Sequence, residues 1–215
     1  MKTPPILVAG ATGNVGRHIV TQLRDAGVTV RALSRDPASP RLPAGVTAVA
    51  GDLTSPDSLR TAAAGAAAAF LLWPFGSAQG AEAAVAALAG QVRRIVFLSA
   101  SSVRDGASPA ENGVWGQVEQ VIERSGTEWV FLRAGGFAAN TLAWADRIRA
   151  GGVVRWAYGE AARSLIHERD IADVAVRALT DRRHAGAKYV LTGPESITQA
   201  DQARTIGEVT SLPVR

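Results

Sequence analysis

A glycine-rich segment near the N-terminus, Gly10-Ala-Thr-Gly-Asn-Val-Gly16, constrains the fold more than any other part of the sequence. The apolar run at 6–9 before it predicts a β-strand, and residues 14–26 after it have helical spacing. Glycines between a strand and a helix let the backbone turn tightly and bring its N–H groups close to a phosphate. A plain turn is the alternative, but this context favours a phosphate-binding turn.

Strand and helix patterns alternate along the first 135 residues. Apolar or β-branched runs predict strands at 6–9, 29–33, 46–50, 67–72, 94–99 and 128–132, and helical spacing predicts helices at 14–26, 56–64, 79–89 and 112–125. The predicted strands are continuously apolar, as in a parallel sheet that helices cover on both faces. We therefore expect an α/β fold, with residues 1–135 forming a Rossmann-type doubly wound parallel sheet.

The pattern changes after residue 135. We expect helices near 138–150, 171–180 and 198–208 and short strands at 153–156 and 188–191. These elements predict a smaller substrate-side region at 136–215, interleaved with the core. Within the core, Ser55 before Pro56 predicts a helix start, and Gly27 and Gly126 predict helix ends.

The composition excludes several classes of protein. The chain has 215 residues and no cysteine, so neither a disulfide framework nor a thiolate metal site is available. The apolar stretch at 62–75 is too short to span a bilayer, and the N-terminus lacks the pattern of a signal peptide. The net charge is +4, but arginines alternate with acids, which disfavours direct nucleic-acid binding. We expect a cytoplasmic, soluble monomer or homodimer with a small-molecule substrate and no metal.

The end of the second predicted strand bears on which dinucleotide binds. NAD enzymes place an acid there against the ribose, whereas NADP enzymes place an arginine against the 2′-phosphate. Here the strand ends in Ser34 and Arg35, and a guanidinium binds phosphate with two hydrogen bonds. Arg31 is a second candidate contact, and Asp36 is the alternative ribose ligand. The sequence thus predicts NADP(H) and leaves NAD(H) open.

Two further strand ends supply candidate cofactor contacts. Asp52 and Leu53 follow the third strand, where an acid can bind the adenine amino group; the alternative is a turn or cap role for Asp52. Leu72, Trp73 and Pro74 end the fourth strand at the edge where ligands of open α/β sheets bind. Trp73 either lines the cofactor groove or belongs to the core.

Several segments together resemble the NmrA-like atypical short-chain dehydrogenases, particularly the bacterial NAD(P)H-dependent quinone and azo reductase branch. These segments are GATGNVG, VRALSRDP, GDLTSPDSL, RRIVFLSASS, VEQVIERSGTEWVFLRAGGFAAN and HERDIADVA. The resemblance implies a cofactor site at Gly10, Thr12, Gly13, Asn14, Val15, Gly16, Arg35, Asp52, Leu53, Leu72, Trp73, Pro74, Ser99, Ala100, Gly135 and Phe137. Family members continue well beyond residue 215, so we expect a truncated or minimal member.

The usual catalytic pair of short-chain dehydrogenases is missing. A typical member uses a tyrosine acid with a lysine four residues later, and Glu111 and Trp115 stand at the aligned places. Tyr158 and Tyr189 have no lysine at that spacing. The remaining candidates for proton transfer are His167, Ser101 and Glu111, each with an ordinary structural role as the alternative. In the same late segment as His167, Asp170 is expected to cap the following helix.

Two functions fit these observations. In the first, NADPH reduces a conjugated acceptor such as a quinone or azo compound, which needs less acid catalysis because its reduced anion is delocalised. Phe137, Trp144 and Trp156 are then candidates for stacking on the acceptor, with core packing as the alternative. In the second, the protein is a non-catalytic sensor of the NADP(H) redox state, and the lost tyrosine supports this reading equally.

Overall fold

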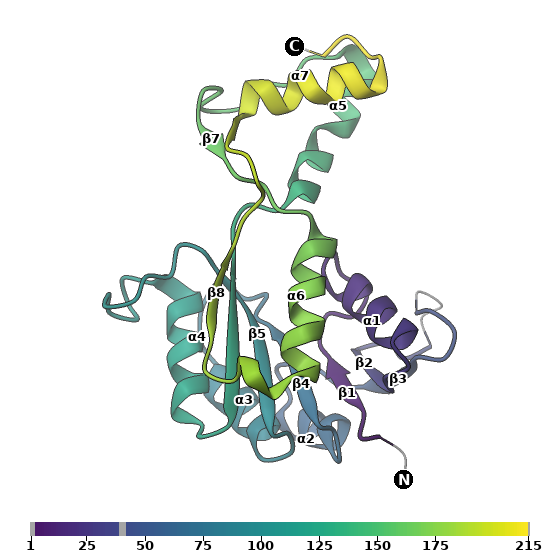
Figure 1. Ribbon diagram of the computed structural model, residues 1–215, viewed down its shortest axis with the longest axis vertical. Helices are drawn as coiled ribbons and strands as arrows, with labels where there is room; N and C mark the ends of the chain where they lie inside the picture. Colours follow the sequence, from purple (N-terminus) through teal and green to yellow (C-terminus); the bar gives the residue numbers. More distant parts are fainter. Residues whose placement is uncertain (1–2, 39–41, 215) are drawn as a thin grey trace. The chain divides into compact units, whose positions relative to one another are not determined.

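The computed structural model describes residues 3–38 and 42–214 (Figure 1). The chain forms two compact units, one made of Met1–Ala134 and Arg169–Leu191 and the other of Gly135–Glu168 and Thr192–Arg215. The chain therefore leaves the first unit after Ala134, returns to it for one helix and one strand, and ends in the second unit.

A seven-stranded parallel sheet forms the centre of the first unit, with the order β3-β2-β1-β4-β5-β6-β8. The order reverses between β1 and β4, and ligands of such sheets bind at this switch point, at the carboxyl ends of the strands. The fold is the predicted Rossmann-type doubly wound sheet. Its strands are β1 (Ile6–Val8), β2 (Val30–Ser34), β3 (Thr47–Ala50), β4 (Ala68–Leu72), β5 (Arg94–Ala100), β6 (Glu128–Ala134) and β8 (Lys188–Leu191).

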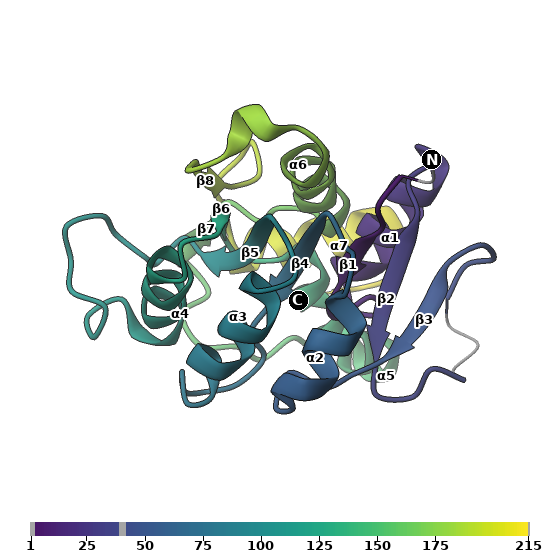
Figure 2. The same cartoon turned by 90° about the horizontal axis from the view of Figure 1, so that it is seen from below.

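Helices cover both faces of this sheet. Figure 2 shows α2, α3 and α4 on one face and α1 and α6 on the other. The bounds are α1 (Gly16–Asp25), α2 (Pro56–Ala63), α3 (Ala81–Ala89), α4 (Gly113–Arg124) and α6 (Glu168–Thr180), which a short 3₁₀ helix, η2 (Arg182–His184), follows. With helices on both faces, the strand side chains are shielded from water: Phe70, Phe97 and Phe131 are each at most 1% exposed.

The predicted helix boundaries hold where glycine marks them. Gly27 follows α1 with φ of 74°, and Gly126 follows α4 with φ of 75°, the left-handed conformation that commonly ends a helix. Ser55 stands directly before Pro56 at the start of α2, as predicted.

The second unit is small and mostly helical. It contains a 3₁₀ helix, η1 (Ala138–Trp144), which leads into α5 (Ala145–Gly151), and a strand pair, β7 (Ala162–Arg163) with β9 (Ile197–Thr198), before α7 (Gln199–Thr210). Trp144, Ile148 and Ala203 form its core. The strand predicted at 153–156 is wrong, because that segment has no regular structure and Val154 packs against the core.

The start of α6 also differs from the prediction. The helix begins at Glu168, so Asp170 lies inside its first turn and does not cap it. Just before the helix, Ile166 forms an isolated parallel bridge with Phe137, so a single residue, His167, separates this pairing from α6. The Glu168 carboxylate accepts a hydrogen bond from the Ala139 amide at 2.9 Å. In the described ranges, no helix combines the length and the apolar character needed to cross a membrane.

Candidate cofactor site

The glycine turn between β1 and α1 is closely packed at two of its glycines. Gly10 has φ of 63°, and a Cβ atom there would lie 2.3 Å from Cδ2 of Leu72 at the end of β4. A Cβ atom on Gly16 would lie 2.1 Å from the Gly10 carbonyl oxygen. Between them, the Gly13 amide donates to the Gly10 carbonyl at 2.9 Å. Glycine is therefore required at Gly10 by conformation and at Gly16 by space.

The start of α1 fits a diphosphate. The first N–H groups of a helix have no partner within it, and they form the positive end of the helix dipole. Thr12, Gly13 and Asn14 are exposed in front of this end, Val15 is buried, and the first turn contains no acidic side chain. A dinucleotide diphosphate would thus meet exposed backbone and no negatively charged side chain in the first turn.

The end of β2 leaves Arg35 exposed and fixes its neighbours in a turn. The Ser34 hydroxyl donates to the Asp36 carbonyl at 2.7 Å, and the Asp36 carboxylate accepts from the Ala38 amide at 3.2 Å. Asp36 therefore contributes Oδ1 to the turn, and the exposed guanidinium of Arg35 is a charged group available to a ligand at this strand end.

Arg31 does not face the ligand edge. Its Nη1 donates to the carbonyl oxygens of Ala62 and Ala64, at 3.2 and 2.6 Å, where α2 ends. The prediction of a second phosphate contact is therefore wrong, because the side chain leaves β2 toward the face that α2 covers.

Asp52 occupies a turn and keeps one oxygen available. Its Oδ1 accepts from the amide and the hydroxyl of Thr54, both at 2.8 Å. These hydrogen bonds lower the pKa of Asp52, burial opposes them, and the charge of Arg35 adds a smaller lowering effect. Among the described residues, Oδ2 has no hydrogen-bond partner and can accept from an adenine amino group. The adjacent Leu53 packs on the core of the sheet.

At the end of β4, Trp73 belongs to the core. It is 5% exposed, its Nε1 donates to the Ser77 carbonyl at 2.8 Å, and its ring meets Phe75 edge-on. The core alternative for Trp73 is therefore correct. Leu72 is half-buried against Gly10, and Pro74 is exposed.

The predicted cofactor contacts at the carboxyl end of β5 differ in how deeply they are buried. Ser99 is buried, and its hydroxyl donates to Glu119 Oε1 at 2.5 Å, so its side chain faces α4. Ala100 is half-buried and Ser101 is exposed. The Ser101 amide donates to the Ala134 carbonyl at 2.9 Å, which ties the ends of β5 and β6 together.

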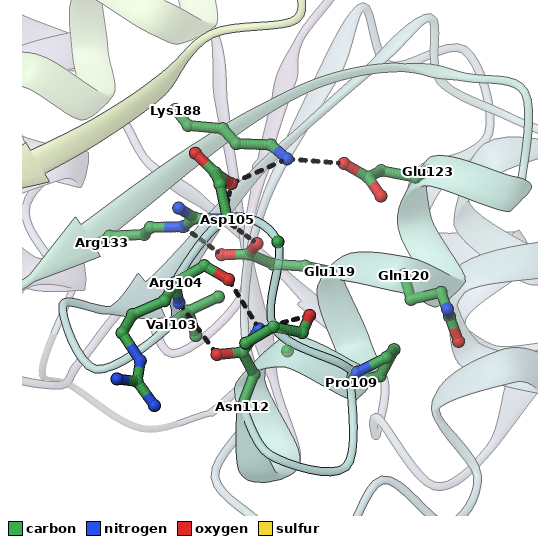
Figure 3. A pocket seen from close by; sticks show the side chains of 13 residues that line it. Val103, Arg104, Asp105, Pro109, Asn112, Glu119, Gln120, Glu123, Arg133 and Lys188 are labelled. Carbon is green, nitrogen blue, oxygen red and sulfur yellow. Dashed lines mark hydrogen bonds and ion pairs between the residues drawn. The ribbon is translucent and has the colours of Figure 1, made fainter.

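A buried ionic network lies beside this strand end, and the sequence analysis did not predict it. Arg133 and Glu119 are each 4% exposed and form two hydrogen bonds, of 3.0 and 2.8 Å. Arg133 also binds Asp105 at 3.0 Å, and Lys188 bridges Asp105 and Glu123 (Figure 3). Hydrogen bonds from Arg133 and Lys188 lower the pKa of Asp105. The sequence feature that could have indicated this network is Arg133, a charged residue inside the otherwise apolar end of β6.

The network borders a cavity of about 220 Å³ under the loop that joins β5 to α4. Opposite charges already pair within its wall, so the network holds the loop and β6 in place.

The candidates for proton transfer lie apart in the chain. Glu111 is exposed, and Ser108 donates to its carboxylate from both its amide and its hydroxyl at 2.7 Å. These bonds lower the pKa of Glu111, which makes it a poor proton donor near neutral pH. Trp115 is 40% exposed on α4. His167 belongs to the second unit and is exposed one residue before α6.

The second unit contains the remaining predicted contacts, Gly135 and Phe137, both half-buried. Around Phe137, the Ala138 amide donates to the Ile166 carbonyl at 2.9 Å. Trp144 is buried, which supports its core alternative, whereas Trp156 is 57% exposed. No cluster of three or more metal-ligating side chains occurs in residues 3–38 and 42–214.

Comparison with known proteins identifies relatives along nearly the whole chain. Residues 10–182 match a family of NAD(P)H-binding proteins. The chain is 40% identical to a (4-alkanoyl-5-oxo-2,5-dihydrofuran-3-yl)methyl phosphate reductase of Streptomyces griseus and 36% identical to an NAD(P)H azoreductase of Xenophilus azovorans, each over 98% of this chain and 75% of the relative. An NADPH-dependent quinone oxidoreductase of Escherichia coli, solved with NADPH, superposes with a TM-score of 0.83 at 23% identity, covering 97% of this chain and 76% of that one.

Proposed function

Because this chain belongs to the family of NAD(P)H-binding proteins, in its NmrA-like atypical short-chain dehydrogenase branch, we propose that it reduces a small conjugated acceptor with NADPH. The acceptor class is a quinone or an azo compound, and the reaction proceeds without a tyrosine and lysine pair. The glycine turn at the switch point of the sheet, with Arg35 at the neighbouring strand end, carries the cofactor part of this proposal. The reductases among its relatives support the acceptor part.

Each part of the first unit has a role in this proposal. The start of α1 binds the diphosphate through backbone N–H groups, Arg35 binds the 2′-phosphate, and Asp52 binds the adenine amino group. Bound NADPH supplies a hydride, which carries two electrons, and a proton from water completes the reduction of a quinone to a hydroquinone. In this proposal the reaction takes place in the cytoplasm, and the small acceptor is the molecule that the protein binds besides the cofactor.

Replacing Arg35 by alanine is expected to raise the Kd for NADP+ about 30-fold and to leave the Kd for NAD+ nearly unchanged. The loss corresponds to hydrogen bonds between a guanidinium and a phosphate, worth about 2 kcal/mol. Titration calorimetry with both nucleotides measures the difference. Arg60→Ala is the matched control, because Arg60 is an exposed arginine of α2 paired with Asp57. Equal losses for both nucleotides in Arg35→Ala would show that the phosphate contact is elsewhere.

Turnover assays separate the reductase from the redox sensor. The purified protein is incubated with NADPH and a panel of quinones and azo dyes while the absorbance of the reduced nicotinamide is followed. Oxidation of NADPH that depends on a member of the panel supports the reductase. Tight NADPH binding with no turnover across the panel contradicts it and favours the non-catalytic sensor.

A further inference from the structure

Two residues other than glycine have positive φ in the described part of the chain, Tyr158 at 60° and Ser211 at 56°. Ser211 has a local explanation, because it ends α7 and its amide bonds back to the Glu208 carbonyl. Tyr158 ends no helix and lies in the loop between α5 and β7 (Figure 1). A bulky side chain rarely adopts this conformation, so the backbone at Tyr158 is strained.

The start of α7 maintains this strain. Gln199, only 8% exposed, donates through its side-chain amide to the carbonyl oxygens of Ala157 and Tyr158, at 3.2 and 3.3 Å. The Gln199 amide donates to the Ala161 carbonyl at 3.2 Å, and the Ala161 amide donates to the Tyr158 carbonyl at 2.9 Å. These bonds fix the backbone on both sides of Tyr158, as strained positions require.

The Tyr158 side chain gains little from being held there. It is 83% exposed, the largest value among the exposed large hydrophobic residues of the described chain. Trp156, two residues earlier, is 57% exposed, but its ring meets the buried Trp144 edge-on at 6.1 Å. The loop therefore presents two aromatic rings, one supported by the core of the unit and one held in solvent by the backbone alone. Strain of this kind clusters at ligand-binding positions.

We propose that Tyr158 is an acceptor-binding residue, whose ring stacks on the planar conjugated acceptor, with Trp156 as its neighbour. The inference rests on the proposed function for the identity of the ligand. A flat, electron-poor acceptor suits the electron-rich ring of a tyrosine, because aromatic rings stack in offset geometry. The backbone at Tyr158 is already held in place, so only its two side-chain torsions lose freedom on binding.

The test compares Tyr158→Gly and Tyr158→Phe with the wild type and with two controls. Ser211→Gly removes the side chain at the other positive-φ position of the described chain, and Val209→Ala trims an 81% exposed residue of α7. The Kd of a naphthoquinone is measured by quenching of tryptophan fluorescence with NADP+ bound, and KM is measured with NADPH. Tyr158→Gly is expected to raise both about tenfold without lowering Tm or NADPH affinity. Tyr158→Phe and both controls keep wild-type values.

The outcomes separate this inference from the proposed function. Turnover of the quinone with unchanged values in Tyr158→Gly overturns the inference and leaves the reductase. Quinone binding that Tyr158→Gly weakens, without turnover by the wild type, supports the binding role and overturns the reductase. A wild type that neither binds nor reduces the quinone contradicts both. A fall in Tm with Tyr158→Gly shows a structural role and overturns the inference.

Discussion

Replacing Glu119 by alanine is expected to destabilise the first unit by about 3–5 kcal/mol, the usual cost of leaving one member of a buried ion pair unpartnered. Arg133, inside β6, would keep its charge, and its remaining ion-pair partner among the described residues would be Asp105, which is 68% exposed. The Ser99 hydroxyl would also lose its acceptor. Urea unfolding measured by circular dichroism gives the change in free energy.

Two further variants give this prediction its control. Asp105→Ala removes the exposed partner of the same arginine and is expected to cost less than about 1 kcal/mol. The double variant Glu119→Leu with Arg133→Met replaces both charges by apolar groups and is expected to be more stable than Glu119→Ala. If Glu119→Ala lowered the free energy of unfolding as little as Asp105→Ala, water would have to be solvating the charge of Arg133 in place of Glu119.

The fold of the first unit could be predicted because its signals are local. The strand before Gly10, the turn itself and the helix after it are neighbours in the sequence, and Gly27 and Gly126 end helices through their own backbone conformation. The pairing of Glu119 with Arg133 joins a helix to a strand, and no local rule connects the two residues. The short strands of the second unit were missed for the same reason, since β7 and β9 lie more than thirty residues apart.

The candidate site could be predicted in its backbone more readily than in its side chains. A strand directs alternate residues to opposite faces, but the sequence does not say which face a ligand uses. The sequence therefore does not show that the side chains of Arg31 and Ser99 hydrogen-bond toward α2 and α4. The strained conformation of Tyr158 is set by Gln199, forty-one residues away, and no feature of its own segment predicts it.

Replacing Gly16 by alanine is expected to raise the Kd for NADPH about 100-fold. The new methyl group would lie 2.1 Å from the Gly10 carbonyl oxygen and 2.7 Å from its carbon, and both are backbone atoms that cannot rotate away. The turn must therefore move away from α1, and the N–H groups that meet the diphosphate move with it. Losing two hydrogen bonds to a charged group, each worth about 1.5 kcal/mol, gives a factor of about 100.

The matched control is Gly90→Ala, where the new methyl group meets only the Ala86 carbonyl at 3.5 Å and the backbone has an ordinary φ of −70°. This variant is expected to bind NADPH as the wild type does. Affinity is measured by fluorescence of the bound reduced nicotinamide, and Tm is measured beside it to show that Gly16→Ala is folded. A folded Gly16→Ala protein with wild-type affinity would mean that the diphosphate is bound by side chains such as Arg35 rather than by the backbone of the turn.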